Sequence, residues 1–326
     1  MKKKRILSGM RPTGRLHLGN YVGALENWVR LQDEYECFYF IADWHALTTD
    51  YDRAGDLRGN SVQVAIDYLA AGLDPERSTL FVQSSVPEHA ELHLLFSMVT
   101  PLPWLERVPS YKDLLQNIDH DINTYGFLGY PVLQTADILM YKADAVPVGE
   151  DQVAHVELTR EIARRFNHLY APVFPEPQSL LTSTPKLPGT DGRKMSKSYG
   201  NTIALGDPPK EVRQSMMTMM TDPARKRRND PGNPDVCPVF DYHKVFSDEK
   251  TLEEVDQGCR SAGIGCVECK GWLFDKHQAK FGPIYERRVH YENNQRKVED
   301  VLEAGAERAR KCAVQTMSEV REAMKL

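Results

Sequence analysis

The sequence predicts an α/β protein, in which a doubly wound parallel sheet is followed by a smaller C-terminal α-helical domain. In the first half of the 326 residues, apolar strand-like segments alternate with segments of helical periodicity, which implies parallel strands joined by helices. Residues 171–209 are rich in proline and glycine, as in a loop-rich connector. Beyond this connector the periodicity is helical almost throughout. We therefore expect one domain over residues 1–206 and a second over residues 207–326.

Four short apolar segments have the composition of buried strands: residues 5–9, 37–42, 79–83 and 145–148. Apolar residues that recur every three or four positions predict helices over residues 18–29, 56–73 and 152–166. Residues 280–326 are highly charged and favour helix, with an apolar stripe at Val298, Val301, Leu302 and Ala309. Gly305 falls on the same face and weakens this helix, because glycine is a poor helix former.

The composition excludes several classes of protein. Hydrophobic residues make up 41% of the chain and charged residues 27%, which is typical of a folded globular protein and not of a disordered one. The net charge of −5 argues against a protein that coats DNA or RNA, although a polyanion can still bind at local basic clusters such as residues 225–228. The sequence holds neither an apolar run of membrane-spanning length nor an apolar leader, so we expect no membrane partner and a cytoplasmic location.

One candidate site follows the first predicted strand. The segment from Ser8 to Asn20 leaves that strand and enters a helix, so it lies at the carboxyl edge of the sheet, where ligands bind. Gly14 and Gly19 allow close backbone approach, and the amino terminus of the helix attracts phosphate. His17 can donate a hydrogen bond to a phosphate oxygen from the same turn. On its own, this turn is equally consistent with an ordinary strand-to-helix connection that carries a solvent-facing histidine.

A second candidate site is the glycine-flanked loop KMSKS at residues 194–198. Lys194 and Lys197 are three positions apart on long flexible stems, so they can reach one triphosphate together. A solvated basic turn explains this loop in isolation. The presence of both segments in this order on one chain favours a nucleotide site.

The two segments, LHLGN at residues 16–20 and KMSKS, together resemble the two signatures of class I aminoacyl-tRNA synthetases. The resemblance implies a Rossmann-like catalytic domain, with ATP as a substrate and Mg²⁺ as a cofactor. It implies that His17 and Asn20 steady the phosphates and that Lys194 and Lys197 neutralise the leaving pyrophosphate. An amino-acid carboxylate is already a nucleophile, so the chemistry needs alignment and fixed positive charge and no general base. Further ATP contacts are expected at Arg11, Thr13, Gly19, Gly149, Asp151, Met195 and Ser196.

Longer stretches narrow the resemblance to the bacterial tryptophanyl-tRNA synthetases. The similar stretches are residues 8–28, 40–49, 129–141 and 146–167. This resemblance implies L-tryptophan as the amino acid, tRNA(Trp) as the partner and a homodimer as the assembly. An interface could use the apolar side chains of Phe96, Met98, Val99, Leu102 and Trp104, which serve a protein core equally well.

The same resemblance implies that Asp137 accepts a hydrogen bond from the indole N–H of tryptophan. A carboxylate suits this role because the indole nitrogen is a donor only. An acidic residue near the start of a helix is the alternative reading of Asp137. Further tryptophan contacts are expected at Leu7, His45, Tyr130, Gln134 and Gln152. Arg11 stands where other members of the family have glutamine.

Four of the six cysteines form a spaced quartet. Cys237, Cys259, Cys266 and Cys269 are separated by 21, 6 and 2 residues. Clustered thiolates indicate a soft-metal site, and their spacing does not distinguish tetrahedral zinc from an iron–sulfur cluster. A subset of bacterial tryptophanyl-tRNA synthetases resembles this pattern and carries a [4Fe–4S] cluster in its helical anticodon-binding domain, so we expect the cluster, with Zn²⁺ as the alternative.

Three other functions are also consistent with the sequence. The first is a tyrosine enzyme on the same plan, and the second is a nucleotidyltransferase that does not act on tRNA. The third is a non-enzymatic relative that binds RNA or senses redox state. Amino-acid-dependent exchange of pyrophosphate with ATP separates these alternatives.

Overall fold

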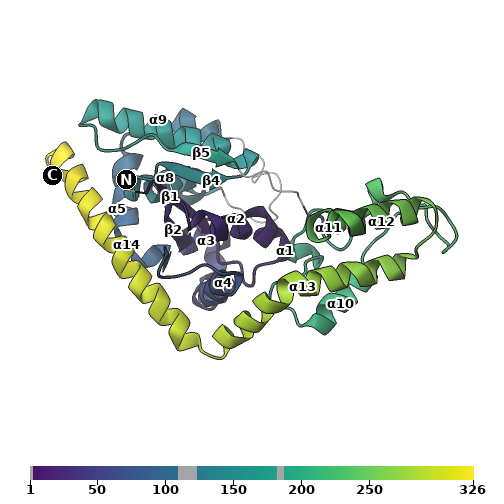
Figure 1. Cartoon of the computed structure of the whole chain (residues 1–326). Coiled ribbons are helices and arrows are strands. Elements are labelled where there is room, and N and C mark those ends of the chain that lie inside the picture. Colours follow the sequence, from purple (N-terminus) through teal and green to yellow (C-terminus); the bar gives the residue numbers. More distant parts are fainter. Residues whose placement is uncertain (1–2, 109–122, 182–186) are drawn as a thin grey trace. The chain divides into compact units, whose positions relative to one another are not determined.

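The computed structural model describes residues 3–108, 123–181 and 187–326. Its sheet has five parallel strands in the order β3-β2-β1-β4-β5 (Figure 1). The strands are β1 (Arg5–Met10), β2 (Glu36–Ile41), β3 (Ser78–Val82), β4 (Ala145–Val148) and β5 (Gln178–Leu181). The doubly wound parallel sheet predicted from the sequence is confirmed.

The helices described in the structure, which keep the labels of Figure 1, are the following. They are α1 (Leu18–Asn20), α2 (Glu26–Leu31), α3 (Asp43–Asp50), α4 (Leu57–Ala71), α5 (Glu88–Ser97), α6 (Leu102–Glu106), α8 (Tyr125–Met140), α9 (Val153–Leu169), α10 (Pro209–Thr218), α11 (Pro238–Phe246), α12 (Glu249–Arg260), α13 (Cys266–Glu292) and α14 (Gln295–Met324). None of the helices in the described ranges combines the length and apolar character that a membrane span requires.

The four predicted strands are confirmed as β1 to β4, and two details differ from the expectation. The helix expected over residues 18–29 contains a π-helical turn at Tyr21–Leu25. The connector over residues 171–209, expected to be loop, contains β5. This strand has only four residues, follows prolines and is half exposed, so its sequence carries little hydrophobic pattern. Residues 182–186 of the connector, with Pro185, lie outside the described ranges.

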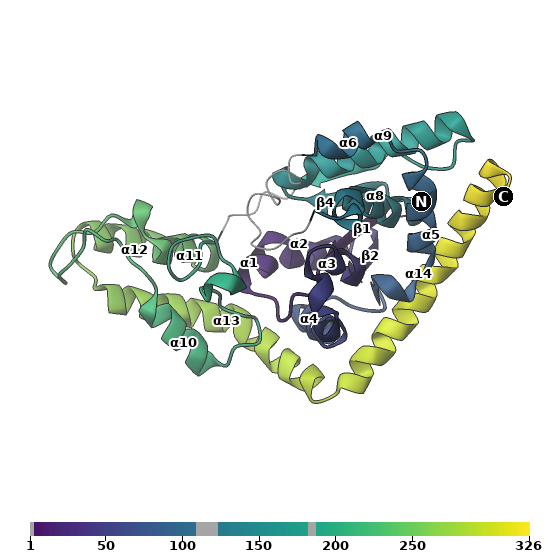
Figure 2. The same ribbon diagram turned by 180° about the vertical axis from the view of Figure 1, so that it is seen from behind.

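Strand β2 shows why helices cover both faces of the sheet. Successive side chains of a strand point to opposite faces, and Phe38 and Phe40 join the large core formed with α5, α8 and α9. Tyr39 points the other way and stacks on Trp28 of α2, with ring centroids 4.8 Å apart. Figure 2 shows α4 and α8 on opposite sides of the sheet. Every position of β2 from Cys37 onward is therefore buried.

The chain divides into two compact units. The first holds residues 1–14, 27–183 and 294–326, and the second holds residues 15–26 and 184–293. The last helix, α14, belongs to the first unit, where it packs on β3, α4, α5 and α8. The two units are groups of residues in contact with one another, so they do not test the expected functional division at residue 206, which stays a prediction.

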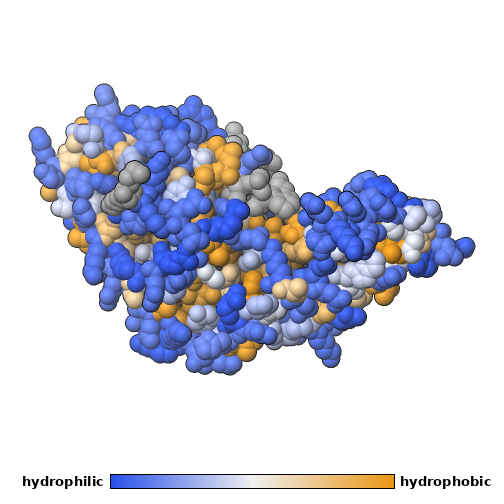
Figure 3. Space-filling model, in the orientation of Figure 1, coloured by the Kyte–Doolittle hydropathy of each residue, from blue (hydrophilic) through white to orange (hydrophobic). Residues whose placement is uncertain are grey.

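The hydrophilic surface in the space-filling view includes the charged outer side of α14 (Figure 3).

Gly305 has a packing role that the sequence did not reveal. It is buried in the middle of α14, which continues through it without a break. A Cβ atom at this position would lie 1.7 Å from the carbonyl oxygen of Leu80 in β3. Glycine is therefore what allows this helix backbone to approach the strand.

We expect Gly305→Ala to destabilise the first unit by about 3 kcal/mol, because the new methyl group overlaps a strand backbone that cannot move away cheaply. The free energy of unfolding measured in urea checks this value. Gly59→Ala is the matched control, since Gly59 lies in α4 with nothing within 4 Å of its Cβ position. There the substitution should raise stability by about 0.5–1 kcal/mol. Equal effects at the two positions would contradict the packing role.

His277 makes the stability of the second unit depend on pH. It is 3% exposed, its ring stacks on Phe281 with centroids 4.6 Å apart, and its Nε2 has no partner in the structure. Burial lowers the pKa of His277 to about 4. The unfolded chain keeps an ordinary histidine pKa near 6.5, so between about pH 6.5 and pH 4 it binds more protons than the folded chain. Stability from this residue therefore falls as the pH falls through that window.

The expected loss is about 2–3 kcal/mol for this one residue by pH 4. Unfolding measured at pH 7 and at pH 4 should show a smaller difference in His277→Leu than in the unaltered chain. An identical pH dependence in the two proteins would show that His277 is protonated in the folded state.

Candidate active site

The turn after β1 is closed by His17 and Asn20. The backbone N–H of His17 donates to Asn20 Oδ1 at 3.0 Å, and the N–H of Asn20 donates to His17 Nδ1 at 3.3 Å. Because Nδ1 accepts a hydrogen bond, the proton of the neutral imidazole is on Nε2. Burial, helped by the charge of Lys197, lowers the pKa of His17 to about 4. At neutral pH this side chain is therefore uncharged and carries one N–H donor, on Nε2.

The KMSKS loop is held by Asn201, which the sequence analysis did not identify. This side chain is 2% exposed. Its Oδ1 accepts from the N–H of Ser196 at 2.8 Å, and its Nδ2 donates to the carbonyl of Lys194 at 3.1 Å and to Asp191 Oδ1 at 2.7 Å. The hydrogen bond from Asn201 is the main cause that lowers the pKa of Asp191 to about 2. The loop backbone is thus fixed, while the side chains of Lys194 and Lys197 are exposed.

Within the second unit the two loops are joined through the backbone. Leu18 donates to the carbonyl of Ile203 at 2.9 Å, and Leu205 donates to the carbonyl of Leu16 at 2.9 Å. A Cβ atom at Gly19 would lie 3.4 Å from the sulfur of the buried Met195 and 3.1 Å from the His17 ring. The tighter approach is to the His17 ring, so the absence of a side chain at Gly19 leaves room for this ring beside the turn. The backbone thus holds the His17 turn beside the segment that follows the KMSKS loop.

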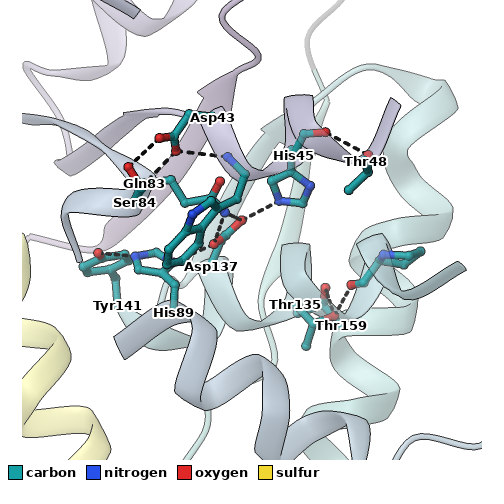
Figure 4. A network of polar contacts seen from close by, with 12 residues as sticks. Asp43, His45, Thr48, Gln83, Ser84, His89, Thr135, Asp137, Tyr141 and Thr159 are labelled. Atoms are coloured by element: carbon teal, nitrogen blue, oxygen red, sulfur yellow. Dashed lines mark hydrogen bonds and ion pairs between the residues drawn. The ribbon is translucent and has the colours of Figure 1, made fainter. Parts of the chain in front are cut away.

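In the first unit, Asp137 is the centre of a buried polar network (Figure 4). Its Oδ1 lies 2.5 Å from His89 Nδ1 and its Oδ2 lies 2.7 Å from His45 Nε2. Gln83 Nε2 donates to both oxygens, at 2.8 and 3.0 Å. Burial would raise the pKa of Asp137, but hydrogen bonds from His45 and His89 outweigh it, so the pKa is lowered and the carboxylate stays charged. The network comes from α3, α5, α8 and the end of β3.

The other residues expected to bind ATP or tryptophan from the first unit lie in β1, on the segments that follow the strands and on α8. Arg11 Nη1 donates to Thr49 Oγ1 at 3.0 Å, and Thr13 donates its backbone N–H to the Arg11 carbonyl. Tyr130 Oη is 2.8 Å from His155 Nε2. The remaining expected residues are Leu7, buried in β1, Gln134, half-buried on α8, Gly149 and Asp151 after β4, and Gln152, which donates to Asp151 Oδ2 at 3.1 Å.

Sequence reasoning missed Gln83, His89 and Tyr141 of the Asp137 network. Gln83 had a usable signal, because it directly follows β3 and ligand-facing residues gather at the carboxyl ends of parallel strands. His89 and Tyr141 gave no such signal, since a buried histidine or tyrosine inside an apolar helix pattern is indistinguishable from core.

The four cysteines of the predicted metal site line one pocket in the second unit. Arg225 reaches the same pocket, with Nη1 3.8 Å from the sulfur of Cys259. Burial, and then the charges of the other three cysteines, raise the pKa of the Cys269 thiol to about 12. Among the described residues, no three metal-ligating side chains are already arranged around an ion position. The fold gathers the quartet, and nothing in its geometry identifies a metal.

A parallel sheet whose first turn pairs with a KMSKS loop is the architecture of a class I aminoacyl-tRNA synthetase. The chain belongs to the family described as tRNA synthetases class I (W and Y), which matches residues 1–282. It is 58% identical over 325 residues to the tryptophan–tRNA ligase of Thermotoga maritima, with 99% of each chain covered. It is 48% identical to the tryptophan–tRNA ligase of Aquifex aeolicus, with 99% of this chain and 100% of the relative covered.

A solved structure gives the same result. The tryptophanyl-tRNA synthetase of Campylobacter jejuni, crystallised with ADP and tryptophan, superimposes with a TM-score of 0.89 at 34% identity. The match covers 99% of this chain and 100% of that one.

Proposed function

We propose that the chain attaches L-tryptophan to tRNA(Trp) at the expense of ATP. The observation that carries this proposal is the backbone pairing of the His17 turn with the segment after the KMSKS loop, since it gathers the phosphate-binding groups of both signatures. ATP and Mg²⁺ are typical of the family. The relatives that match over the whole chain and carry the name tryptophan–tRNA ligase support the choice of amino acid.

In the first step, a carboxylate oxygen of tryptophan attacks the α-phosphorus of ATP. The bond between that phosphorus and the oxygen bridging to the β-phosphate breaks, and pyrophosphate leaves with the electron pair. The neutral His17 donates from Nε2 to a phosphate oxygen, while Lys194 and Lys197 offset the charge that grows on the leaving group. Mg²⁺ bound to ATP supplies further positive charge. Alignment replaces a general base, because the carboxylate is already ionised.

In the second step, a hydroxyl of the terminal ribose of the tRNA attacks the carbonyl carbon of tryptophanyl-adenylate. The ester bond to the tRNA forms, the bond between the carbonyl carbon and the phosphate oxygen of the adenylate breaks, and AMP leaves with the electron pair while the hydroxyl proton is released. The further ATP contacts proposed for this chain are Arg11, Thr13, Gly19, Asn20, Gly149, Asp151, Met195 and Ser196.

We assign the choice of tryptophan to the first unit. Asp137 accepts from the indole N–H, and Leu7, His45, Tyr130, Gln134 and Gln152 complete the tryptophan contacts. A tyrosine or phenylalanine side chain has no N–H donor at this position, so it would lose the hydrogen bond that the indole makes to this buried carboxylate.

The test is the exchange of labelled pyrophosphate into ATP, measured separately with tryptophan and with tyrosine. We expect exchange with tryptophan and none with tyrosine. Exchange with tyrosine alone would assign the chain to the tyrosine branch, and no exchange with either would leave a non-enzymatic relative. Charging of tRNA(Trp) then separates the ligase from a nucleotidyltransferase that does not act on tRNA.

We also propose that Cys237, Cys259, Cys266 and Cys269 hold a metal centre, either a [4Fe–4S] cluster or Zn²⁺. The proposal is supported by the lining of one pocket with four thiols, a donor set that suits both. Purification without oxygen, followed by an absorption spectrum and by iron, sulfide and zinc analysis, distinguishes them. Absence of all three elements would overturn the proposal.

Three further hypotheses belong to the same proposal. We assign anticodon binding to the helical part of residues 207–326, and we place the enzyme in the cytoplasm, where tRNA is charged. We expect a homodimer, for which the side chains of Met98 and Leu102, 68% and 59% exposed, offer apolar contacts, while Phe96 and Val99 belong to the core. A monomer at micromolar concentration in light scattering would overturn the dimer.

A further inference from the structure

We infer that His89 and Tyr141 are positioning residues that orient Asp137, so that one particular carboxylate oxygen, Oδ2, receives the indole N–H. This inference rests on the proposed function and adds two residues that touch no substrate. It begins with the hydroxyl of Tyr141, which lies 2.7 Å from His89 Nε2 in a fully buried position. His89 Nδ1 in turn lies 2.5 Å from Asp137 Oδ1.

Asp137 and Tyr141, the two outer residues of this hydrogen-bonded series, indicate which atoms donate and which accept. Asp137 is a charged carboxylate and can only accept, so His89 Nδ1 carries a proton. At the other end, burial and then the charge of Asp137 hold the pKa of Tyr141 well above its ordinary value, so its hydroxyl keeps its proton. Tyr141 can therefore donate to His89 Nε2, and in that arrangement the proton of the His89 ring is on Nδ1.

The two oxygens of Asp137 consequently have different surroundings. Oδ1 accepts from His89 and Gln83, and both of these side chains are 0% exposed. Oδ2 accepts from Gln83 and from His45, whose side chain is 12% exposed. Each oxygen thus accepts two hydrogen bonds, and the two differ in that Oδ2 faces the less buried partner, His45 (Figure 4).

The orientation of Gln83 supports this assignment. Its amide nitrogen must face Asp137, because the opposite orientation would place a carbonyl oxygen against the carboxylate. With Gln83 and His89 both committed, the carboxyl plane of Asp137 cannot turn without breaking buried hydrogen bonds. Removal of the Tyr141 hydroxyl frees His89 Nε2, so that His89 can change tautomer or tilt and release Oδ1.

The experiment compares binding of tryptophan with binding of β-(benzothienyl)alanine, in which sulfur replaces the indole N–H. In Tyr141→Phe, we expect the Kd of tryptophan to rise about 3- to 10-fold, the loss of about one hydrogen bond. The Kd of the sulfur analogue should stay unchanged, because it does not use Oδ2. Tyr125→Phe is the matched control, since Tyr125 begins α8, the helix that ends just before Tyr141, and is 70% exposed.

Each outcome decides between two explanations. Equal weakening of both ligands in Tyr141→Phe would indicate a merely structural tyrosine and overturn the inference, as would unchanged binding of both. A ¹⁵N spectrum of labelled histidine gives an independent readout, in which His89 should be the neutral Nδ1–H tautomer. An imidazolium signal from His89 would contradict the proposed hydrogen bonds from Tyr141 through His89 to Asp137. If the unaltered chain shows no tryptophan-dependent pyrophosphate exchange, the proposed function fails. The ¹⁵N spectrum then still tests the hydrogen bonds from Tyr141 through His89 to Asp137.

Discussion

Lys197→Ala is expected to lower the rate of tryptophan-dependent pyrophosphate exchange by two to three orders of magnitude. Removal of one fixed donor that meets charge developing in a transition state costs about 3–4 kcal/mol in comparable sites. The side chain of Lys197 is exposed, and the backbone of its loop is held by hydrogen bonds from Asn201. Truncation of Lys197 therefore removes a charge without disturbing the fold. The effect should fall on kcat, with the KM for tryptophan nearly unchanged, because the charge it offsets appears only as pyrophosphate leaves.

Lys250→Ala is the matched control for this substitution. Lys250 lies in the same unit, and its side chain is 84% exposed. Its removal should leave exchange unchanged. A rate loss of less than about threefold in Lys197→Ala would show that the KMSKS loop does not neutralise the leaving group.

The second large effect is expected for Asp137→Asn, which should lower kcat/KM for tryptophan by at least a thousandfold. The substitution removes a buried charge and turns an acceptor into a donor in front of His45 and His89. Donors buried without acceptors cost about 1–3 kcal/mol each, and the indole N–H loses its partner as well.

Steady-state exchange with each substrate varied in turn measures this effect. The KM for ATP should be unchanged, because no phosphate contact is altered. Asp52→Asn, which removes a carboxylate that is 64% exposed in the same unit, is the control and should retain full activity. Activity within tenfold of the unaltered chain would contradict the role of Asp137 as the indole acceptor.

The parts of this molecule that sequence predicts well are those governed by local pattern. Strands β1 to β4 are continuous apolar segments, and α4 and α9 have clear helical periodicity, so both kinds of element were found to within a few residues. The residues of the HLGN and KMSKS motifs were found for a related reason, since motif spacing is a local property.

Contacts between distant segments could not be found in this way. The clamp of Asn201 on Ser196 is decided by a loop conformation, and the bonds from Leu18 to Ile203 join segments far apart in the chain. Gly305 is a second case in which local sequence misleads. Its local propensity argues against helix, yet contact with the Leu80 backbone makes glycine the residue that fits. Helix propensity describes one residue in isolation, whereas the packing of α14 on β3 decides which residue fits at position 305.

The position of α14 has a consequence for biosynthesis. The ribosome makes β3 long before α14, the helix that packs on this strand. Until α14 emerges, the nascent first unit leaves apolar side chains such as Phe81 without part of their native cover, which exposes it to chaperones and to aggregation. Assembly of this unit is therefore complete only after α14 has been made, and it depends on long-range contacts, which are slow to form.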